Sequence, residues 1–187
     1  MVENELLKSA AAVLERGGVV ACATEGVLGL SCRPDCHAAI ERILAIKQRP
    51  ADKGMILVAA DYEQLVPFID ESRLAPERKA EVLASWPAAV TWLLPARPEV
   101  SILLRGVFPT LAVRVTPHPQ LAALCRLVSS PLVSTSANLS GEAAPASFAE
   151  LDARVAALVD YCLPGETLGR RGPSQIRSLD GVTIRGG

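Results

Sequence analysis

A series of short apolar runs, each ending in polar or glycine-rich sequence, constrains this fold more than any other feature. These runs lie at 19–24, 55–60, 90–94, 110–116 and 131–136. Each has the length of a buried strand and is shorter than an ordinary buried helix. Because patterns with helical spacing separate the runs, the sequence predicts an α/β protein in which helices cover a sheet.

The segments between the runs carry helix signals. Gly17-Gly18 ends the first periodic segment, Asp61 caps a short helix that ends near Pro67, and Ser147 with Glu150 forms a capping-box pattern. Hairpin-like pieces near the C-terminal end interrupt the alternation, which favours a twisted mixed sheet, largely parallel with antiparallel parts. We predict helices over 4–16, from Asp35 to the KQRP segment, over 76–85, 117–128 and 147–159, and short strands over 173–176 and 182–185.

Composition indicates one globular domain over residues 1–187. Half of the residues are apolar and 21% are charged, so the chain can bury a sizeable core. The formal net charge of −1 does not indicate nucleic-acid binding through bulk charge. We find no signal-peptide pattern and no apolar run long enough to span a bilayer, and therefore expect a cytoplasmic protein without membrane contact.

The cysteines and histidines do not form a recognisable metal motif. Five cysteines are an odd number and are spread along the chain, as expected for reduced thiols. Cys32, Cys36 and His37 have an unusual spacing, and His118 stands alone. Because a structural zinc site needs about four ligands, we predict no metal ligands in this chain.

The segment KQRPADKG places three cations between a predicted helix and a predicted strand. Lys47, Arg49 and Lys53 could cradle a polyanion, since ammonium and guanidinium groups bind phosphate oxygens well. Pro50 disfavours helix at Arg49 and so ends the helix there. A solvated basic helix end, favoured by the helix dipole, is the alternative interpretation.

Other polar residues also lie at the ends of apolar runs. Thr24-Glu25 and two glycines follow the first run, Ser134 to Asn138 end the fifth, and Ser174 lies in a late strand-like piece. Arg114 lies among apolar neighbours, so it needs either an ion-pair partner or an anionic ligand. If these residues converge, they form a cationic, hydroxyl-lined cleft suited to a nucleotide or another small polyanion.

Five segments taken in order resemble the YrdC/TsaC family. They are Thr24-Glu25 followed by Gly-Leu, then KQRPADKG, LAVRVTPHP, PLVSTSANLSG and PSQI. The resemblance covers nearly the whole chain, and the KQRP-x-DKG form is similar to the short bacterial TsaC type. It implies an α/β sheet curled around a large basic cavity.

The resemblance also implies an activity. Family members are nucleotidyltransferases that make L-threonylcarbamoyl-adenylate and pyrophosphate from L-threonine, bicarbonate or carbon dioxide, and ATP with Mg²⁺. Separate transferase proteins then use the product to modify the adenosine beside the anticodon of tRNA. An RNA-binding relative without adenylate synthesis is the alternative, although aromatic residues make up only 4% of the chain.

Matching the family motifs residue by residue implies the roles of individual side chains. Lys47 and Arg49 are the implied catalytic residues. The implied threonine-binding residues are Thr24, Arg114 and Ser134. The implied ATP-binding residues are Lys47, Arg49, Lys53, Thr110, Ser136, Asn138, Ser174 and Arg185.

The chain departs from the family pattern at three positions. Ala23 replaces a proline, Leu28 replaces an aromatic residue, and Val58 stands where longer members carry a histidine. We expect Leu28 to loosen the wall around the methyl group of the bound threonine. His37 and His118 lie outside the motifs, so the sequence indicates no general base.

Overall fold

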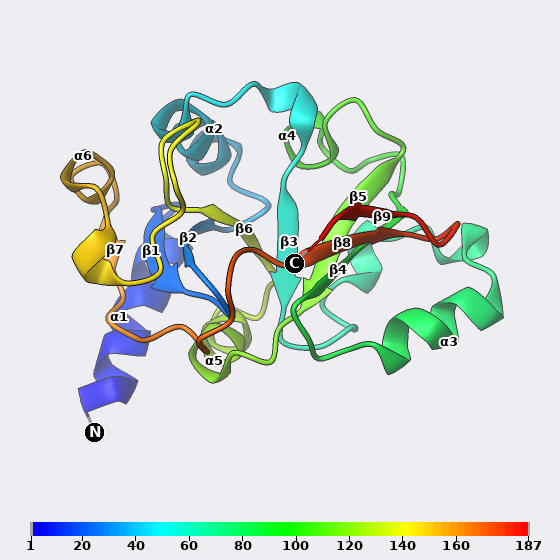
Figure 1. The fold of residues 1–187 in the computed structure, drawn as a ribbon, viewed down its shortest axis with the longest axis horizontal. Helices are drawn as coiled ribbons and strands as arrows, with labels where there is room; N and C mark the ends of the chain where they lie inside the picture. The colour runs from blue at the N-terminus through cyan, green and yellow to red at the C-terminus, as the bar shows by residue number, and fades with distance from the viewer. Residues whose placement is uncertain (1, 187) are drawn as a thin grey trace.

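The computed structural model describes residues 2–186, which form helices around one mixed sheet (Figure 1). The nine strands follow the order β7-β1-β2-β6-β3-β5-β4-β8-β9, so the sheet is open, with β7 and β9 at its edges. The strands are β1 (Val20–Ala23), β2 (Leu28–Cys32), β3 (Ile56–Ala59), β4 (Val90–Pro95), β5 (Thr110–Val115), β6 (Leu132–Ser136), β7 (Tyr161–Cys162), β8 (Gln175–Ser178) and β9 (Thr183–Arg185).

Both pairing directions occur in the sheet, which confirms the predicted mixed α/β architecture, but the prediction that the sheet is largely parallel is wrong, because five of its eight strand pairs within residues 2–186 are antiparallel. Strand β3 pairs with β5 in parallel, as β4 does with β8 and β1 with β7, and the other pairs are antiparallel. The helices are α1 (Val2–Glu15), α2 (His37–Lys47), α3 (Pro76–Ala84), α4 (Ile102–Arg105), α5 (Pro119–Leu127) and α6 (Ala153–Ala156). None of the helices within residues 2–186 is long and apolar enough to cross a membrane.

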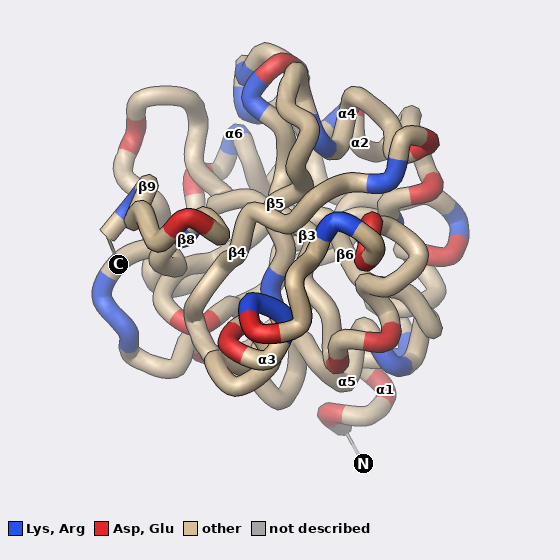
Figure 2. Tube along the Cα trace, turned by 90° about the vertical axis from the view of Figure 1, so that its right-hand side faces the viewer, with Lys and Arg blue, Asp and Glu red and all other residues tan. Residues whose placement is uncertain are grey.

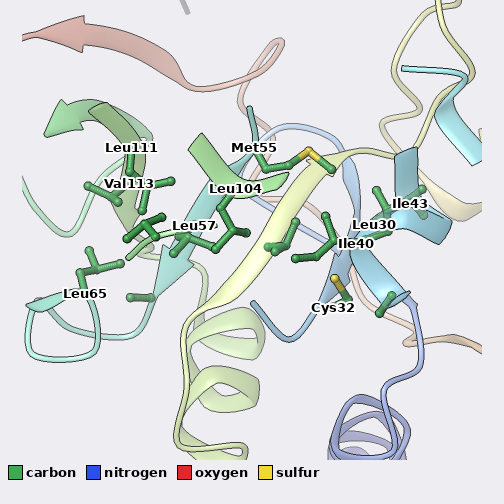
Figure 3. Close-up of a cluster of buried hydrophobic side chains, with 14 of the residues drawn as sticks. Leu30, Cys32, Ile40, Ile43, Met55, Leu57, Leu65, Leu104, Leu111 and Val113 are labelled. Carbon is green, nitrogen blue, oxygen red and sulfur yellow. The ribbon is translucent and has the colours of Figure 1, made fainter. Parts of the chain in front are cut away.

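One face of the sheet is covered by apolar side chains. Alternate residues along each strand point to the same face, so Leu30 of β2, Leu57 of β3 and Val113 of β5 contribute to one cluster. Ile40 and Ile43 of α2 pack against it (Figure 3). This cluster is the main hydrophobic core.

The opposite face is covered over only part of its area. Helices α1 and α5 pack together and bury Val20, Val58 and Leu132 (Figure 1). Farther along the same strands, Thr110 and Ala112 of β5 face a cavity instead of a helix. The division of this face between helices and open space creates the room for a site.

The structure corrects the predicted start of the second helix. Asp35 is not the capping residue, because Cys36 is the N-cap and has no side-chain capping bond. Asp35 instead forms an ion pair with Arg33, with 2.7 Å between Oδ2 and Nη2. The nearby cationic side chain is therefore a stronger partner for this carboxylate than the helix terminus.

The predicted helix over 147–159 is also wrong. The capping-box contacts do not form, because Ser147 makes no side-chain capping bond; its Oγ donates to Glu150 Oε1 at 3.2 Å, and Ala146 N donates to Glu150 Oε2 at 2.9 Å. Only a 3₁₀ turn forms at Phe148–Glu150, and Leu151 after it is extended. The short α6 then begins separately, with Asp152 as its cap.

Several smaller elements differ from the prediction or were missed by it. Asp61 accepts a hydrogen bond from Gln64 N at 3.2 Å, but a turn and a 3₁₀ segment at Val66–Phe68 replace the short helix. Strands β2 and β7 and helix α4 were not predicted. The five cysteines are free thiols.

Leu57 provides a test of the core. Its side chain is fully buried at the centre of the main cluster (Figure 3), so Leu57→Ala removes apolar contacts and leaves a cavity. We expect the free energy of unfolding to fall by about 3 kcal/mol, measured by urea denaturation. Leu158→Ala is the matched control, since Leu158 is 51% exposed, and a comparable loss there would contradict this assignment of the core.

Candidate functional site

A cavity of about 420 Å³ opens on the uncovered part of the sheet face. Its floor is formed by alternate residues of adjacent strands, among them Gly29 of β2, Ile56 of β3 and Ala112 of β5. Its polar lining consists of Thr24, Glu25, Arg49, Lys53, Arg105, Thr110, Arg114, Ser134, Thr135, Ser136, Ser174 and Arg185.

The predicted site residues largely converge on this cavity. Of the eleven residues predicted, nine line it, and Lys47 and Asn138 do not. Figure 2 shows acidic and basic residues intermixed along the chain, in keeping with the formal net charge of −1. The positive character of the site is therefore local to the cavity.

Arg49 reaches the cavity because the helix before it ends abruptly. Gln48 adopts a left-handed conformation with φ of 48°, which turns the chain after α2. Arg49 Nη2 donates to Gly54 O at 2.9 Å, whereas Nε is buried without a hydrogen-bond partner. Burial lowers the pKa of Arg49, yet a guanidinium stays protonated at neutral pH. The alternative of a merely solvated basic helix end does not describe this side chain.

Lys47 lies behind the cavity wall and is only 4% exposed. Its Nζ donates to Asn138 O at 2.9 Å and to Ser136 O, and it lies 3.3 Å from Asn138 Oδ1. Burial and the neighbouring Arg49 charge lower the pKa of Lys47 to about 8. The ammonium group thus holds the end of β6 and the following loop together and does not line the cavity, and its contact with a nucleotide stays a prediction.

Asn138, like Lys47, makes its hydrogen bonds within the protein and supports the cavity wall. Its Nδ2 donates to Leu139 O and to Glu142 O, both at 2.8 Å. The side chain therefore closes the loop after β6 on itself. Together with Lys47 it shapes the wall from which Ser136 faces the cavity.

Arg114 is the most deeply buried cation of the lining, at 5% exposure. The ion-pair alternative considered for this residue is confirmed, because Nη2 lies 3.1 Å from Glu25 Oε2, and the side chain also lines the cavity. Its Nε is buried without a hydrogen-bond partner. Desolvation lowers the pKa of Arg114, and the Glu25 carboxylate opposes that shift.

Glu25 is a site residue that the sequence did not identify. The available signal was a buried arginine in a strand without an obvious partner, together with a Thr-Glu pair at another strand end. Choosing Glu25 as that partner needed the strand order, because β1 and β5 are not neighbours in the sheet.

Thr24 contributes its methyl group to the cavity wall. Its Oγ1 donates to Val27 O at 2.7 Å, which closes the turn between β1 and β2. A Cβ atom added at Gly29 would lie 3.2 Å from Thr24 Cγ2 and 3.3 Å from Ser134 Oγ. Gly29 therefore keeps this corner of the cavity open, and Thr24, Gly29 and Ser134 form a small, partly apolar wall.

The three departures from the family pattern lie outside the cavity. Ala23 and Leu28 are fully buried in the main core, so the expectation that Leu28 forms the wall near a bound methyl group is wrong. Leu28 faces away because its neighbours Val27 and Gly29 line the cavity. Val58 is aligned with Arg114 but is buried beneath α1 and α5.

The C-terminal strands form the far wall. Arg185 Nε and Nη2 both donate to Ser174 O, at 3.1 and 2.9 Å. Ser174 Oγ shares a 2.8 Å hydrogen bond with Thr91 Oγ1, which ties this wall to β4. The pKa of Arg185 is lowered by burial and by the charges of Arg114 and Arg49, so three guanidinium groups act on the same space.

The histidines and cysteines have structural roles or none in the site. No group of three or more His, Cys, Asp or Glu side chains within residues 2–186 could hold a metal ion. His118 is buried, its Nδ1 accepts from Leu121 N at 3.3 Å, and its Nε2 lies 2.9 Å from Glu166 O. His37 is the first residue of α2.

The fold and the site define an α/β protein with a cationic cavity for small polyanions, placed at strand ends of an open sheet. The chain belongs to the Sua5/YciO/YrdC family, because the family model described as "Telomere recombination" matches residues 12–187.

Two sequence relatives and one solved structure illustrate this membership. Threonylcarbamoyl-AMP synthase of Vibrio cholerae is 48% identical over 184 residues, covering 98% of this chain and 97% of the relative. The protein of the same name from Serratia proteamaculans is 50% identical over 170 residues, covering 90% and 89%. The crystal structure of P. abyssi Sua5 complexed with L-threonine superposes with a TM-score of 0.85 and 32% identity. That match covers 96% of this chain and 53% of the Sua5 chain, so this chain spans about half the length of Sua5.

A pair of lysine variants tests the structural role of Lys47. Lys47→Met leaves buried carbonyl oxygens without a donor, so we expect the free energy of unfolding to fall by about 1–3 kcal/mol. Lys53→Met removes the same charge from an exposed residue and should change it by less than about 0.5 kcal/mol. Equal losses in thermal or urea unfolding would contradict the internal role of Lys47.

Proposed function

We propose that this chain is a threonylcarbamoyl-AMP synthase, which forms threonylcarbamoyl-AMP and pyrophosphate from L-threonine, bicarbonate and ATP. The observation that carries the proposal is that the guanidinium-bearing residues Arg49 and Arg114 line one cavity together with Lys53, Arg185 and several serine and threonine residues. Such a cavity offers two separate anion seats. The curated relatives that match nearly the whole chain carry the name of this activity.

The amino acid would occupy the seat beside Arg114. Its carboxylate would accept from the Arg114 guanidinium, and charge-assisted hydrogen bonds of this kind are the strong ones. Thr24, Gly29 and Ser134 surround a small side chain at this end. L-threonine, with one methyl and one hydroxyl group, suits a wall that is partly apolar and partly hydroxylic.

The nucleotide would occupy the seat beside Arg49. Lys53 lies at the mouth and Ser136 on the wall, and both can bind phosphate oxygens. Thr110 and Arg185 extend the lining away from this seat. Apolar lining residues, including Phe108, Ile176 and Ile184, give a base and ribose an apolar surface.

The proposed reaction has two bond-forming steps. The threonine amine attacks the carbon of carbon dioxide, which bicarbonate supplies by losing hydroxide, and the amine proton neutralises that hydroxide to give water. A carbamate oxygen then attacks the α-phosphorus of ATP, and the bond to pyrophosphate breaks. Because the threonine carboxylate, the carbamate and ATP all carry negative charge, the chain contributes mainly alignment and fixed positive charge. Arg49, Lys53, Arg114 and Arg185 supply that charge from the cavity wall, and Lys47 adds to it from behind.

Mg²⁺ enters this proposal as part of the nucleotide substrate. Mg²⁺ keeps several waters and binds substrate phosphates in many nucleotide sites. Within the described lining, the Glu25 carboxylate is already paired with Arg114, which leaves phosphate oxygens as the natural ligands. The product would pass to separate transferase proteins that modify tRNA, which places this chain at the activation step.

Pyrophosphate release tests the proposed function. We expect the purified protein to release pyrophosphate from ATP and Mg²⁺ only when L-threonine and bicarbonate are both present, and to release less with L-serine. The dependence follows because the carbamate, and not water, attacks the α-phosphorus. An absence of release from a protein that still binds ATP would contradict the proposal. RNA affinity and its salt dependence would then test the alternative of an RNA-binding protein.

A second prediction concerns Arg49. Arg49→Ala removes a guanidinium from the phosphate seat, and we expect kcat for pyrophosphate release to fall by about 10²-fold or more. Arg78→Ala is the matched control, since Arg78 lies on α3 in a surface ion pair with Glu81. Near-normal turnover by a folded Arg49→Ala protein would remove Arg49 from the reaction.

A further inference from the structure

Glu25 has no role in the reaction as proposed, although it lines the cavity. Among the described residues that form the lining, it is the one acidic side chain, and it is only 4% exposed. A carboxylate in a cavity that binds anions repels the substrates unless another charge compensates it. Its presence therefore needs an explanation beyond the electrostatics of substrate binding.

Both oxygens of the Glu25 carboxylate are occupied by groups of the chain. Oε2 lies 3.1 Å from Arg114 Nη2, and Oε1 accepts from Thr116 Oγ1 at 2.6 Å. Thr116 Oγ1 in turn accepts from His118 N at 3.1 Å, which fixes the hydroxyl group. The carboxylate thus connects the arginine to the rigid start of α5.

The backbone of Glu25 is equally constrained. Its carbonyl oxygen accepts from Leu168 N at 3.1 Å and from Arg170 N at 3.2 Å. The segment that carries these donors crosses directly over Gly26, where an added Cβ atom would lie 2.8 Å from Arg170 O. Glu25 is therefore held by its side chain and by its main chain.

We propose that Glu25 is a positioning residue that orients Arg114 to receive the carboxylate of L-threonine. Holding Nη2 stops the long side chain from turning and keeps the guanidinium at the cavity wall. The chain of contacts from His118 through Thr116 and Glu25 to Arg114 transmits this constraint from α5 to the cavity. Because both carboxylate oxygens are occupied, Glu25 holds the guanidinium and is not the acceptor of the substrate's proton.

This inference rests on the proposed function and has its own consequences. A misoriented guanidinium weakens binding of the amino acid but leaves the phosphate seat intact. Errors of about 1 Å in the position of a binding group can cost on the order of 10²-fold. The effect should therefore fall on L-threonine and spare ATP.

Thr116 provides the mildest test, because it lies outside the cavity lining. Thr116→Val removes the hydroxyl group that holds Glu25 and leaves both charges of the ion pair in place. We expect the Kd for L-threonine, measured by calorimetry without ATP, and the KM for L-threonine to rise about tenfold. The KM for ATP and kcat at saturating L-threonine should stay within about twofold. Thr116→Ser keeps the hydroxyl group and should restore wild-type affinity.

Glu25→Gln provides the second test, since the amide keeps the shape but removes the charge. We expect a larger rise in the Kd and KM for L-threonine than in Thr116→Val, with the pH profile of kcat unchanged. A fall in kcat with an unchanged KM for L-threonine would instead indicate proton transfer and would overturn the positioning role. Thermal unfolding of each variant checks the fold, and if Glu25→Gln does not fold, the two Thr116 variants decide.

The outcomes separate this inference from the function on which it rests. If the wild-type protein releases pyrophosphate with L-threonine but folded Glu25→Gln and Thr116→Val bind L-threonine like wild type, the inference alone is overturned. If the wild-type protein shows no L-threonine-dependent release, the proposed function fails first.

Discussion

The buried ion pair between Arg114 and Glu25 is the interaction on which the site depends. Arg114 lies on β5, an interior strand between β3 and β4, where an unpaired charge would carry a large desolvation cost. The turn after β1 supplies the compensating carboxylate. Closing that pair brings two segments 89 positions apart, Glu25 and Arg114, to one corner of the cavity. This ion pair leaves Arg114 Nε buried without a hydrogen-bond partner, which costs stability.

The position of the cavity follows from incomplete coverage of the sheet. Helices α1 and α5 protect one part of a face, and the strands continue beyond them with serine, threonine, glycine and arginine on the same side. Period-two alternation places these polar residues in the open space while their neighbours fill the main core. The same strands therefore provide stability on one face and binding groups on the other.

Buried charge also shapes the wall of the site. Lys47 has no anionic partner among its hydrogen bonds, which go to oxygens of residues 136 and 138. Because an ammonium group has several hydrogen-bond donors, it can hold together carbonyl oxygens that would otherwise repel one another. Arg185 has a similar structural role on the opposite wall, where its guanidinium donates two hydrogen bonds to Ser174 O. Cationic side chains of this protein therefore both support the cavity wall and line the cavity.

The sequence by itself determined the principal strands, most helices and the polar residues at their ends, because short apolar runs and helical spacing are local signals. It also carried the resemblance that led to the correct family. The sequence did not predict strand β2, because Gly29 and Ser31 interrupt its apolar pattern. Only its pairing with β1 and β6 makes this segment a strand. Tertiary structure alone decided that Leu28 faces the core, that Lys47 faces inward and that Glu25 meets Arg114. Contacts between distant segments decide which face of the sheet each strand residue points to and which group pairs with a buried charge. No local sequence pattern encodes these contacts.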